Sequence, residues 1–191
     1  MCRAVSDLIH ILARLRVTLG FVFGAVVLTL AAPTPRSIAI GISLAAVGEV
    51  MRVWAAGHLN KAREVTTSGP YRWMAHPLYV GSSVMGVGLA IACGSVPVAI
   101  IIAVYLSTTV TAAIKSEQAY LRRTFGEQYD LYLHGIEAKR LASANRPPRR
   151  FSMAQAMANR EYRAIAGFIV AVLLLVLKAT YNGSFWRAAG G

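Results

Sequence analysis

The amino-acid sequence predicts an all-α, polytopic membrane helix bundle with about five transmembrane helices. Hydrophobic residues make up 56% of the 191 residues and charged residues only 15%, whereas soluble domains have roughly half apolar and a quarter charged residues. Long apolar runs recur along the chain, and basic residues gather in alternate gaps between them. This alternation is typical of membrane proteins, so the net charge of +12 does not indicate a nucleic-acid-binding protein.

Five apolar runs are candidates for spanning helices. A helix needs about 20 residues to cross a bilayer, with about 17 as the short limit. The second and fourth runs meet this length, and the first and third gain a turn from flanking residues. The fifth is short and could instead lie against the bundle. The runs are Val17–Ala32, Ile38–Ala56, Leu78–Cys93, Val96–Ile114 and Ala164–Leu177.

Prolines and glycines mark the expected helix ends. Pro33 and Pro35 close the first helix, because proline cannot continue the backbone hydrogen bonds. Pro77 suits the first position of the third helix, where its missing N–H would be unpaired anyway. Gly94-Ser95 and Pro97 favour a tight turn. The third and fourth helices are therefore expected to form a hairpin.

Small residues recur at helical spacing in three of the runs. Such residues let membrane helices approach closely, where van der Waals packing holds them together. We therefore expect close helix contacts along these faces. The residues are Gly20 and Gly24; Gly41, Ala45 and Gly48; and Ser82, Gly86 and Gly88.

The basic gaps set the expected orientation. Cytoplasmic loops carry the excess of Lys and Arg, while the other two gaps here hold only Arg36 in one case and no charge in the other. We expect a cytoplasmic N-terminus, and the absence of a recognisable organellar signal favours a bacterial inner membrane. The basic residues are Arg3, Arg14 and Arg16; Lys61, Arg63 and Arg72; and Lys115, Arg122, Arg123, Lys139, Arg140, Arg146, Arg149, Arg150, Arg160 and Arg163.

A polar segment, Thr67–Gly81, lies between the second and third runs and carries candidate site residues. His76 precedes Pro77 and so stands at the start of the third helix, beside free N–H groups and the positive end of the helix dipole. Such a helix start can bind a carboxylate or phosphate. Tyr79 and Gly81 follow in the first turn, where the glycine leaves room for a ligand or another backbone. The alternative is an ordinary capping histidine. The segment also contains Tyr71 and Arg72.

Glu117 emerges from the fourth helix at the same membrane face as His76. The stretch that follows has apolar and aromatic residues at helical spacing, which predicts an amphipathic helix on the cytoplasmic leaflet. This interpretation accounts for the arginines there but not for the carboxylate. The hairpin between the third and fourth helices brings Glu117 and the Thr67–Gly81 segment to the same end of the bundle. The stripe consists of Leu121, Phe125, Tyr129, Tyr132, Leu133 and Ile136.

Glu49 and Arg52 lie three residues apart near the end of the second helix. This spacing places them on one face, where they can pair. Ionisable groups at membrane depth usually face the bundle interior or a cavity. The pair is either a structural ion pair or part of a site.

The site residues together suit a zwitterionic soluble ligand that bears an aromatic ring. The acid could hold an ammonium group, the helix start a carboxylate and the tyrosines a ring. Two cysteines, Cys2 and Cys93, have no partner at metal-ligand spacing, and no metal is expected.

The chain resembles the isoprenylcysteine carboxyl methyltransferase family and its phospholipid methyltransferase relatives over roughly residues 48–132. The ordered set of motifs carries the resemblance, since His-Pro-x-Tyr-x-Gly alone would be weak. The motifs are Arg52-Val-Trp54-Ala55, Gly69-Pro70-Tyr71-Arg72, His76-Pro77-Leu-Tyr79-Val-Gly81 and Glu117-x-x-x-Leu121-x-x-x-Phe125-Gly126-x-x-Tyr129-x-x-Tyr132.

The resemblance implies an integral membrane enzyme that uses S-adenosylmethionine. We expect a single membrane domain over residues 1–191, with a cofactor-binding core at 48–136, a basic segment at 137–163 and a last helix at 164–179. The acceptor would be lipid-borne or a small hydrophobic molecule. The implied cofactor residues are His76, Pro77, Tyr79, Gly81, Tyr71, Arg72 and Glu117, and the implied acceptor-side residues are Arg52 and Glu49.

The chain departs from the family pattern in two motifs. Ala75 stands where the family has arginine before His76. The fourth helix reads Ala113-Ile-Lys115-Ser-Glu117-Gln118 where the family has Arg-Ile-x-x-Glu-Glu, and Lys115 lacks arginine's bidentate fork. These departures leave open an alternative, a noncatalytic membrane scaffold or transport-linked protein. A nicotinamide-dependent reductase is disfavoured because no Gly-x-Gly-x-x-Gly motif follows a strand.

Overall fold

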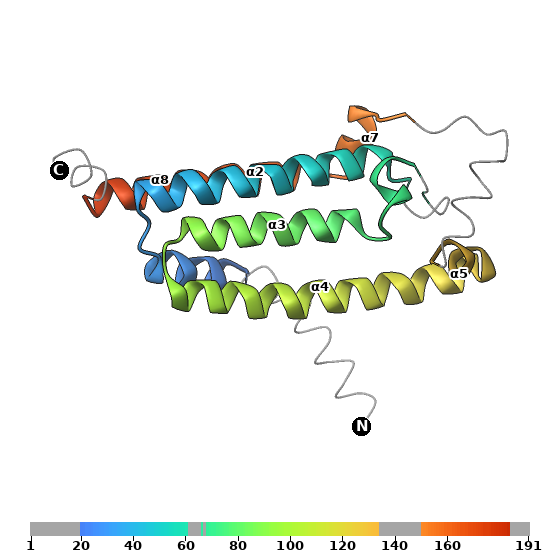
Figure 1. Ribbon diagram of the computed structural model, residues 1–191, viewed down its shortest axis with the longest axis horizontal. Coiled ribbons are helices and arrows are strands. Elements are labelled where there is room, and N and C mark those ends of the chain that lie inside the picture. Colours follow the sequence, from blue (N-terminus) through green and yellow to red (C-terminus); the bar gives the residue numbers. More distant parts are fainter. Residues whose placement is uncertain (1–19, 61–65, 67, 134–149, 184–191) are drawn as a thin grey trace, which may run out of the picture.

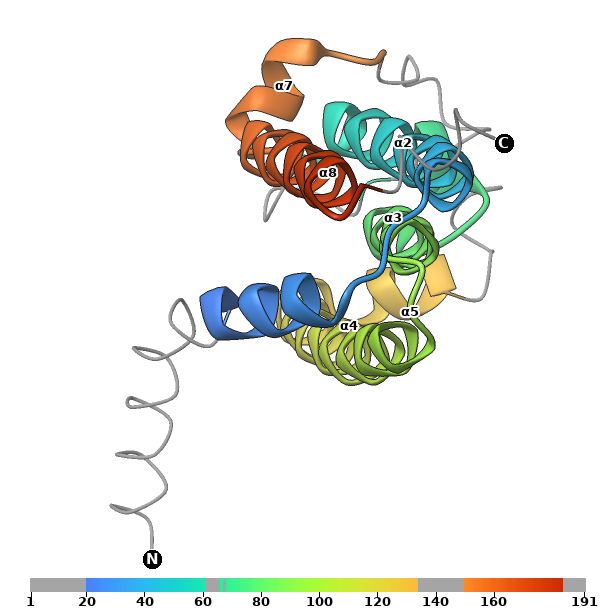
Figure 2. The same cartoon turned by 90° about the vertical axis from the view of Figure 1, so that its left-hand side faces the viewer.

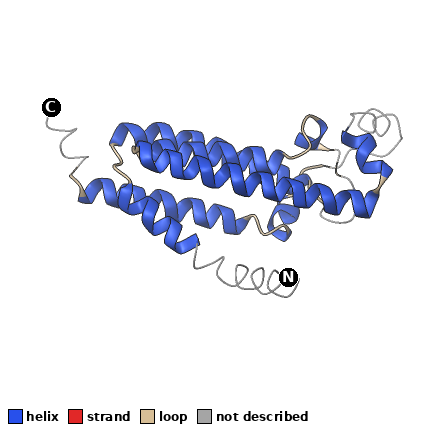
Figure 3. Cartoon of the chain, turned by 90° about the horizontal axis from the view of Figure 1, so that it is seen from below, coloured by secondary structure: helices blue, strands red, loops and turns tan. Residues whose placement is uncertain are grey.

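The protein is a bundle of long helices in a computed structural model that describes residues 20–60, 66, 68–133 and 150–183. Every regular element in this part of the chain is helical (Figure 3). The first is the helix Gly20–Leu30. The others are α2 (Pro35–His58), the short 3-10 helix η1 (Gly69–Arg72), α3 (Pro77–Ala92), α4 (Val96–Phe125), α5 (Glu127–Leu133), α7 (Met153–Ala158) and α8 (Tyr162–Tyr181).

The long helices run side by side and alternate in direction (Figure 1). Viewed along the bundle, α3 lies in the middle, with α2 on one side and α4 on the other, and α8 lies beside α2 (Figure 2). The helix Gly20–Leu30 lies against α4, where Phe23 stacks on Tyr105 with ring centroids 4.4 Å apart. One end of the bundle holds the Gly94-Ser95 turn, here named the hairpin end. The other holds His76 and is named the His76 end.

The predicted membrane helix bundle is confirmed. Three helices are long and apolar enough to cross a membrane, namely α2, α4 and α8, and two shorter apolar helices, Gly20–Leu30 and α3, complete the five predicted segments. The fifth run was the shortest by sequence, yet α8 extends two residues before it and four beyond it, to 20 residues.

The helix ends follow the predicted signals in most places. Pro77 is the first residue of α3, and Gly94, with a φ of 60°, makes the turn of the predicted hairpin. The first helix already ends at Leu30. Pro35 starts α2 instead of only closing the helix before it, because Thr34 and Ser37 form a capping box around it.

The amphipathic helix that was predicted after the fourth span is not one continuous helix. The fourth span continues to Phe125 as the 30-residue α4, and Gly126 then interrupts the helix with a φ of 52°. The seven-residue α5 follows. The apolar stripe is therefore divided at a glycine, the residue that takes such a φ at the least cost.

The closest helix contact is the predicted small-residue face between α2 and α3. A Cβ at Gly88 would lie 2.6 Å from the carbonyl oxygen of Gly41, and one at Gly48 would lie 2.6 Å from that of Gly81. By contrast, a Cβ at Gly20 or Gly24 would have no heavy atom within 4 Å. These two glycines therefore make no close contact among the described residues, contrary to prediction.

Several predictions fall outside the described residues. They concern the start of the first helix at Val17, Thr67, Ile136 and the side chain of Tyr132. The basic residues among them are Arg3, Arg14, Arg16, Lys61, Arg63, Lys139, Arg140, Arg146 and Arg149.

The C-terminal end of α2 is closed by α7 and the residue after it. The side-chain amide of Asn159 donates to the carbonyl oxygens of Ala56 and Leu59, at 2.8 Å each. These are carbonyls of the kind that a helix end leaves unpaired. Ser152 N–H donates to the Gly57 carbonyl oxygen at 3.2 Å. These bonds join segments about 100 residues apart in sequence.

Asn159→Ala should lower the stability of the folded protein by about 2 kcal/mol, since two hydrogen bonds to partly buried carbonyls are lost. Thermal unfolding of the purified protein in detergent measures the change. Gln155→Ala on α7 is the control. Among the described residues the Gln155 side chain makes no hydrogen bond to α2, so this substitution should change stability by about 0.5 kcal/mol or less. Equal melting of Asn159→Ala and the control would contradict this role.

Candidate functional site

His76 and Glu117 meet at the His76 end of the bundle, where α3 begins. The two side chains come from segments 41 positions apart, and their nearest atoms, His76 Nδ1 and Glu117 Oε2, are 3.6 Å apart. The His76 side chain is 14% exposed and that of Glu117 is 31% exposed. The hairpin thus places an acid beside a histidine, at a depth that remains open to water.

Two further polar side chains complete this group. Tyr79 lies one turn into α3, with its ring centroid 5.9 Å from that of His76 and its hydroxyl in a hydrogen bond with Glu117. Gln118 Nε2 lies 3.4 Å from His76 Nε2. The residue that replaces the family's second acid is therefore itself in contact with the histidine.

The start of α3 has no side-chain cap. His76 occupies the N-cap position, yet its side chain makes no capping hydrogen bond. The residue at the first helical position is Pro77, which is buried and carries no N–H. The N–H groups of Tyr79 and Val80 donate to the His76 carbonyl oxygen at 3.1 and 3.2 Å, so it is the positive end of the helix dipole that favours negative charge here.

The loop before α3 has a buried side and an exposed side. Tyr71 is only 7% exposed, whereas Arg72 and Trp73 face solvent or lipid. Gly69 takes a φ of 58° and lies against the His58 ring, where a Cβ would come within 2.6 Å of His58 Cγ. The loop thus packs closely against the His58 ring at Gly69.

Tyr129 on α5 is packed beneath the site and is 1% exposed. Ala75, Leu121, Phe125 and Leu133 surround its ring. Burial raises the pKa of the Tyr129 hydroxyl above its usual value, and the nearby charge of Glu117 raises it further. Ala75, which stands where the family has arginine, is part of this apolar packing.

A second polar group lies deeper, between α2, α3 and the start of α8. Arg52 Nε is 2.8 Å from Glu161 Oε1 and 3.6 Å from Glu49 Oε2. The Arg52 guanidinium also donates to the Ser82 hydroxyl. Both carboxylates are less than a tenth exposed, and among the described residues neither Glu49 oxygen accepts a hydrogen bond.

These contacts confirm the predicted pairing of Glu49 with Arg52 and add a third partner. Glu49 and Arg52 do pair, as their spacing predicted, but the shorter contact of Arg52 is with Glu161. The pair is thus embedded between helices. Gly81 likewise faces α2, where a Cβ would meet the Arg52 side chain and the Gly48 carbonyl oxygen, each at 2.8 Å. Of the two alternatives for this glycine, the structure favours room for another backbone.

Sequence reasoning missed three residues that organise this end of the bundle. Glu161 stood in a basic segment with no periodic signal, and its long-range partner was not visible. Gln118 was considered only as the residue that replaces the family's second glutamate. His58 closes α2 and contacts Trp54 and Phe151, with ring centroids 6.3 and 5.9 Å apart. A single histidine two residues beyond an apolar run carries little signal of its own.

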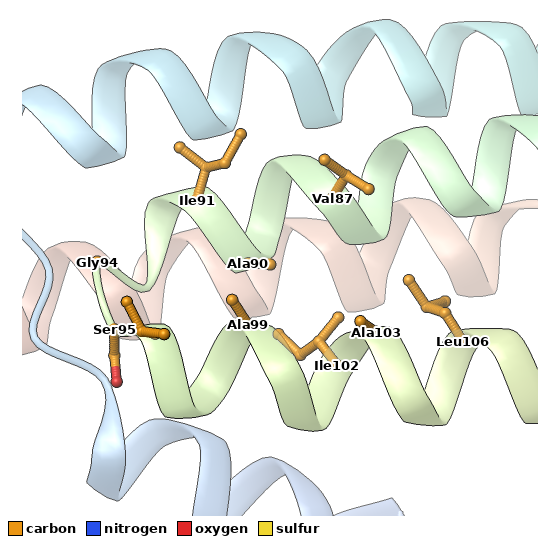
Figure 4. A pocket seen from close by; sticks show the side chains of 10 residues that line it. Val87, Ala90, Ile91, Gly94, Ser95, Ala99, Ile102, Ala103 and Leu106 are labelled. Atoms are coloured by element: carbon orange, nitrogen blue, oxygen red, sulfur yellow. The ribbon is translucent and has the colours of Figure 1, made fainter.

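An apolar cavity lies at the opposite end, between α3 and α4. It has a volume of about 390 Å³, and Val87, Ile91, Ala99, Ile102 and Leu106 are among its lining residues (Figure 4). Its wall is almost entirely hydrocarbon, and it adjoins the hairpin turn. It contains none of the polar site residues.

The apolar helices, with the polar group at the His76 end, define an integral membrane protein of the α-helical type. Residues 36–128 match the model of the phospholipid methyltransferase family. The match covers α2, α3 and α4 with the loop that carries His76. Arg52, His76 and Glu117 lie inside it, whereas Glu161 lies outside.

Two curated relatives are similar to the same part of the chain. The nickel-cobalt-cadmium resistance protein NccN of Alcaligenes xylosoxydans xylosoxydans is 38% identical over 90 residues, which are 46% of this chain and 41% of that protein. The cobalt-zinc-cadmium resistance protein CzcN of Cupriavidus metallidurans is 34% identical over 90 residues, 46% of this chain and 40% of that protein. The chain thus spans about two fifths of the length of these relatives. No solved structure matches it.

Proposed function

We propose that the protein is an integral membrane S-adenosylmethionine-dependent methyltransferase that acts on a lipid-borne or small hydrophobic acceptor. The proposal rests on one observation: the region that matches the family contains the His76–Glu117 pair, which lies at the His76 end of the bundle. We place this end on the cytoplasmic side of a bacterial inner membrane, as the distribution of basic residues predicts.

The residues at the His76 end fit the cofactor chemically. The Glu117 carboxylate suits its ammonium group, and the uncapped start of α3 suits its carboxylate. The rings of His76 and Tyr79 offer faces for the adenine base. Tyr71 would support the loop from its buried side, with Pro77 fixing the helix start. The exposed Arg72 lies at the rim of the loop.

The cofactor supplies an electrophilic methyl group on a sulfonium. Transfer of this group depends more on alignment and exclusion of water than on strong acid–base assistance. The chain's own residues would bind and orient the two reactants. We assign the acceptor side to the region of Arg52 and Glu49, where Arg52 contacts Gly81 and Ser82 on α3, further into the bundle than His76.

Calorimetric titration with S-adenosylhomocysteine in detergent tests the cofactor site. We expect saturable binding that weakens by roughly 30-fold or more in the His76→Ala/Glu117→Ala double variant, since about 2 kcal/mol is typical for losing a hydrogen bond to a charged group. The control is Arg123→Gln, which changes an exposed residue on the same helix as Glu117. This variant should bind like the unchanged protein. A double variant that binds equally well would exclude the proposed site.

A second candidate function is a noncatalytic membrane protein linked to transport. The observation that favours it is that both relatives are named as metal-resistance proteins. In the described residues, no group of three or more His, Cys, Asp or Glu side chains is placed to hold a metal ion. This function predicts no binding of S-adenosylhomocysteine in the same titration, so one experiment separates the two.

A further inference from the structure

The region around α7 has an unusual surface at the level where the spanning helices end. It lies over the C-terminal end of α2 and leads directly into α8 (Figure 1). Four large apolar side chains here are between 37% and 54% exposed. Three arginines among and beside them are also exposed. We name this set the α7 patch: Phe151, Met153, Met157 and Tyr162, with Arg150, Arg160 and Arg163.

The sequence of the α7 patch contains little acid to balance its arginines. Glu161 is the one acidic residue between positions 150 and 163, and it is 5% exposed and paired with Arg52 in the interior. The patch therefore presents three positive charges to its surroundings. Arg160 also has a φ of 63°, a conformation that glycine adopts at lower cost, so the turn by itself does not call for arginine.

Aromatic rings continue from the patch toward the candidate site. Phe151 contacts His58, His58 contacts Trp54, and Trp54 lies 5.8 Å from Trp73 between ring centroids. Trp73 is 73% exposed and stands three residues before His76. Tryptophan and tyrosine are enriched at the headgroup level of membranes. This row of rings indicates that the α7 patch lies at the same level.

We propose that the α7 patch binds the headgroups of anionic phospholipids. The arginines would hold the lipid phosphates, while the four apolar side chains enter the boundary between headgroups and acyl chains. A surface with basic residues beside exposed apolar ones is the combination that such lipids attract. The inference is independent of methyl transfer, since it uses no residue of the proposed cofactor site.

Quenching of tryptophan fluorescence by brominated lipids tests this proposal. The protein is reconstituted in phosphatidylcholine bilayers with a small fraction of brominated phosphatidylglycerol or, in parallel, brominated phosphatidylcholine. A Trp186→Phe background leaves Trp54 and Trp73 as reporters beside the patch. We expect the anionic lipid to be enriched there roughly fivefold or more over its bulk fraction, given about fivefold per basic residue at a membrane surface.

The Arg150→Gln/Arg160→Gln/Arg163→Gln variant should abolish this enrichment, and the corresponding lysine variant should retain most of it, because lysine also binds phosphate. The charge-matched control is Lys115→Gln/Arg122→Gln/Arg123→Gln, which removes three exposed positive charges from α4 and should keep the enrichment. Equal quenching by the two lipids in the unchanged protein would overturn the proposal. So would enrichment that survives in the patch variant, or that is lost equally in the control.

Discussion

Gly88→Ala should unfold or strongly destabilise the protein, although it adds a single methyl group. The new Cβ would overlap the backbone of Ala45 and lie 2.6 Å from the carbonyl oxygen of Gly41 on α2. Backbone atoms in a packed helix pair cannot move aside as a flexible side chain can. We expect a loss of about 3 kcal/mol, at the upper end of what overpacking costs. The melting temperature in detergent measures it.

Gly24→Ala is the matched control for this prediction. It makes the same substitution in a helix of the same chain, but no heavy atom lies within 4 Å of the new Cβ. Because alanine favours a helix more than glycine does, this variant should be neutral or more stable by up to about 1 kcal/mol. Equal melting temperatures of the two variants would contradict a close backbone contact between α2 and α3 at Gly88.

Arg52→Met should cost about 3–5 kcal/mol of stability, the second large effect. Arg52 is the cation between two buried carboxylates, Glu49 and Glu161, and its removal takes away the counter-charge that both have among the described residues. Breaking a buried ion pair from one side is costly for this reason. Thermal unfolding and the yield of monodisperse protein report the loss.

The triple variant Glu49→Gln/Arg52→Met/Glu161→Gln distinguishes charge from packing. With no buried charge left, it should regain most of the stability that Arg52→Met loses. A triple variant as unstable as Arg52→Met would show that the network acts through shape and not through charge. If the triple variant folds and binds S-adenosylhomocysteine but transfers no methyl group, Arg52 and Glu49 serve the acceptor side as proposed.

The helices were predictable from sequence because membrane length and apolar composition act locally. Pro77 and Gly94 fixed the hairpin, and the face of Gly41, Ala45 and Gly48 indicated a close partner. The meeting of His76 with Glu117 followed from the hairpin alone. In each case, one residue's own chemistry and its position in a helix were sufficient.

Other features depend on partners that are far away in sequence. Glu161 lies 109 positions after Arg52, and Asn159 lies about 100 positions after the carbonyls it binds. No local pattern reveals such contacts. The Gly20–Gly24 motif failed for the related reason that small residues permit a close approach but do not supply the partner helix. The division of the amphipathic stripe depended on Gly126 alone.

Transfer of a labelled methyl group tests the central claim most directly. Membranes containing the protein are incubated with methyl-labelled S-adenosylmethionine, and the label is counted in the lipid extract and in a panel of small thiols. We predict incorporation by the unchanged protein and its loss in the His76→Ala/Glu117→Ala variant. No incorporation into any of these acceptors by the unchanged protein, or equal incorporation by the double variant, would contradict the account.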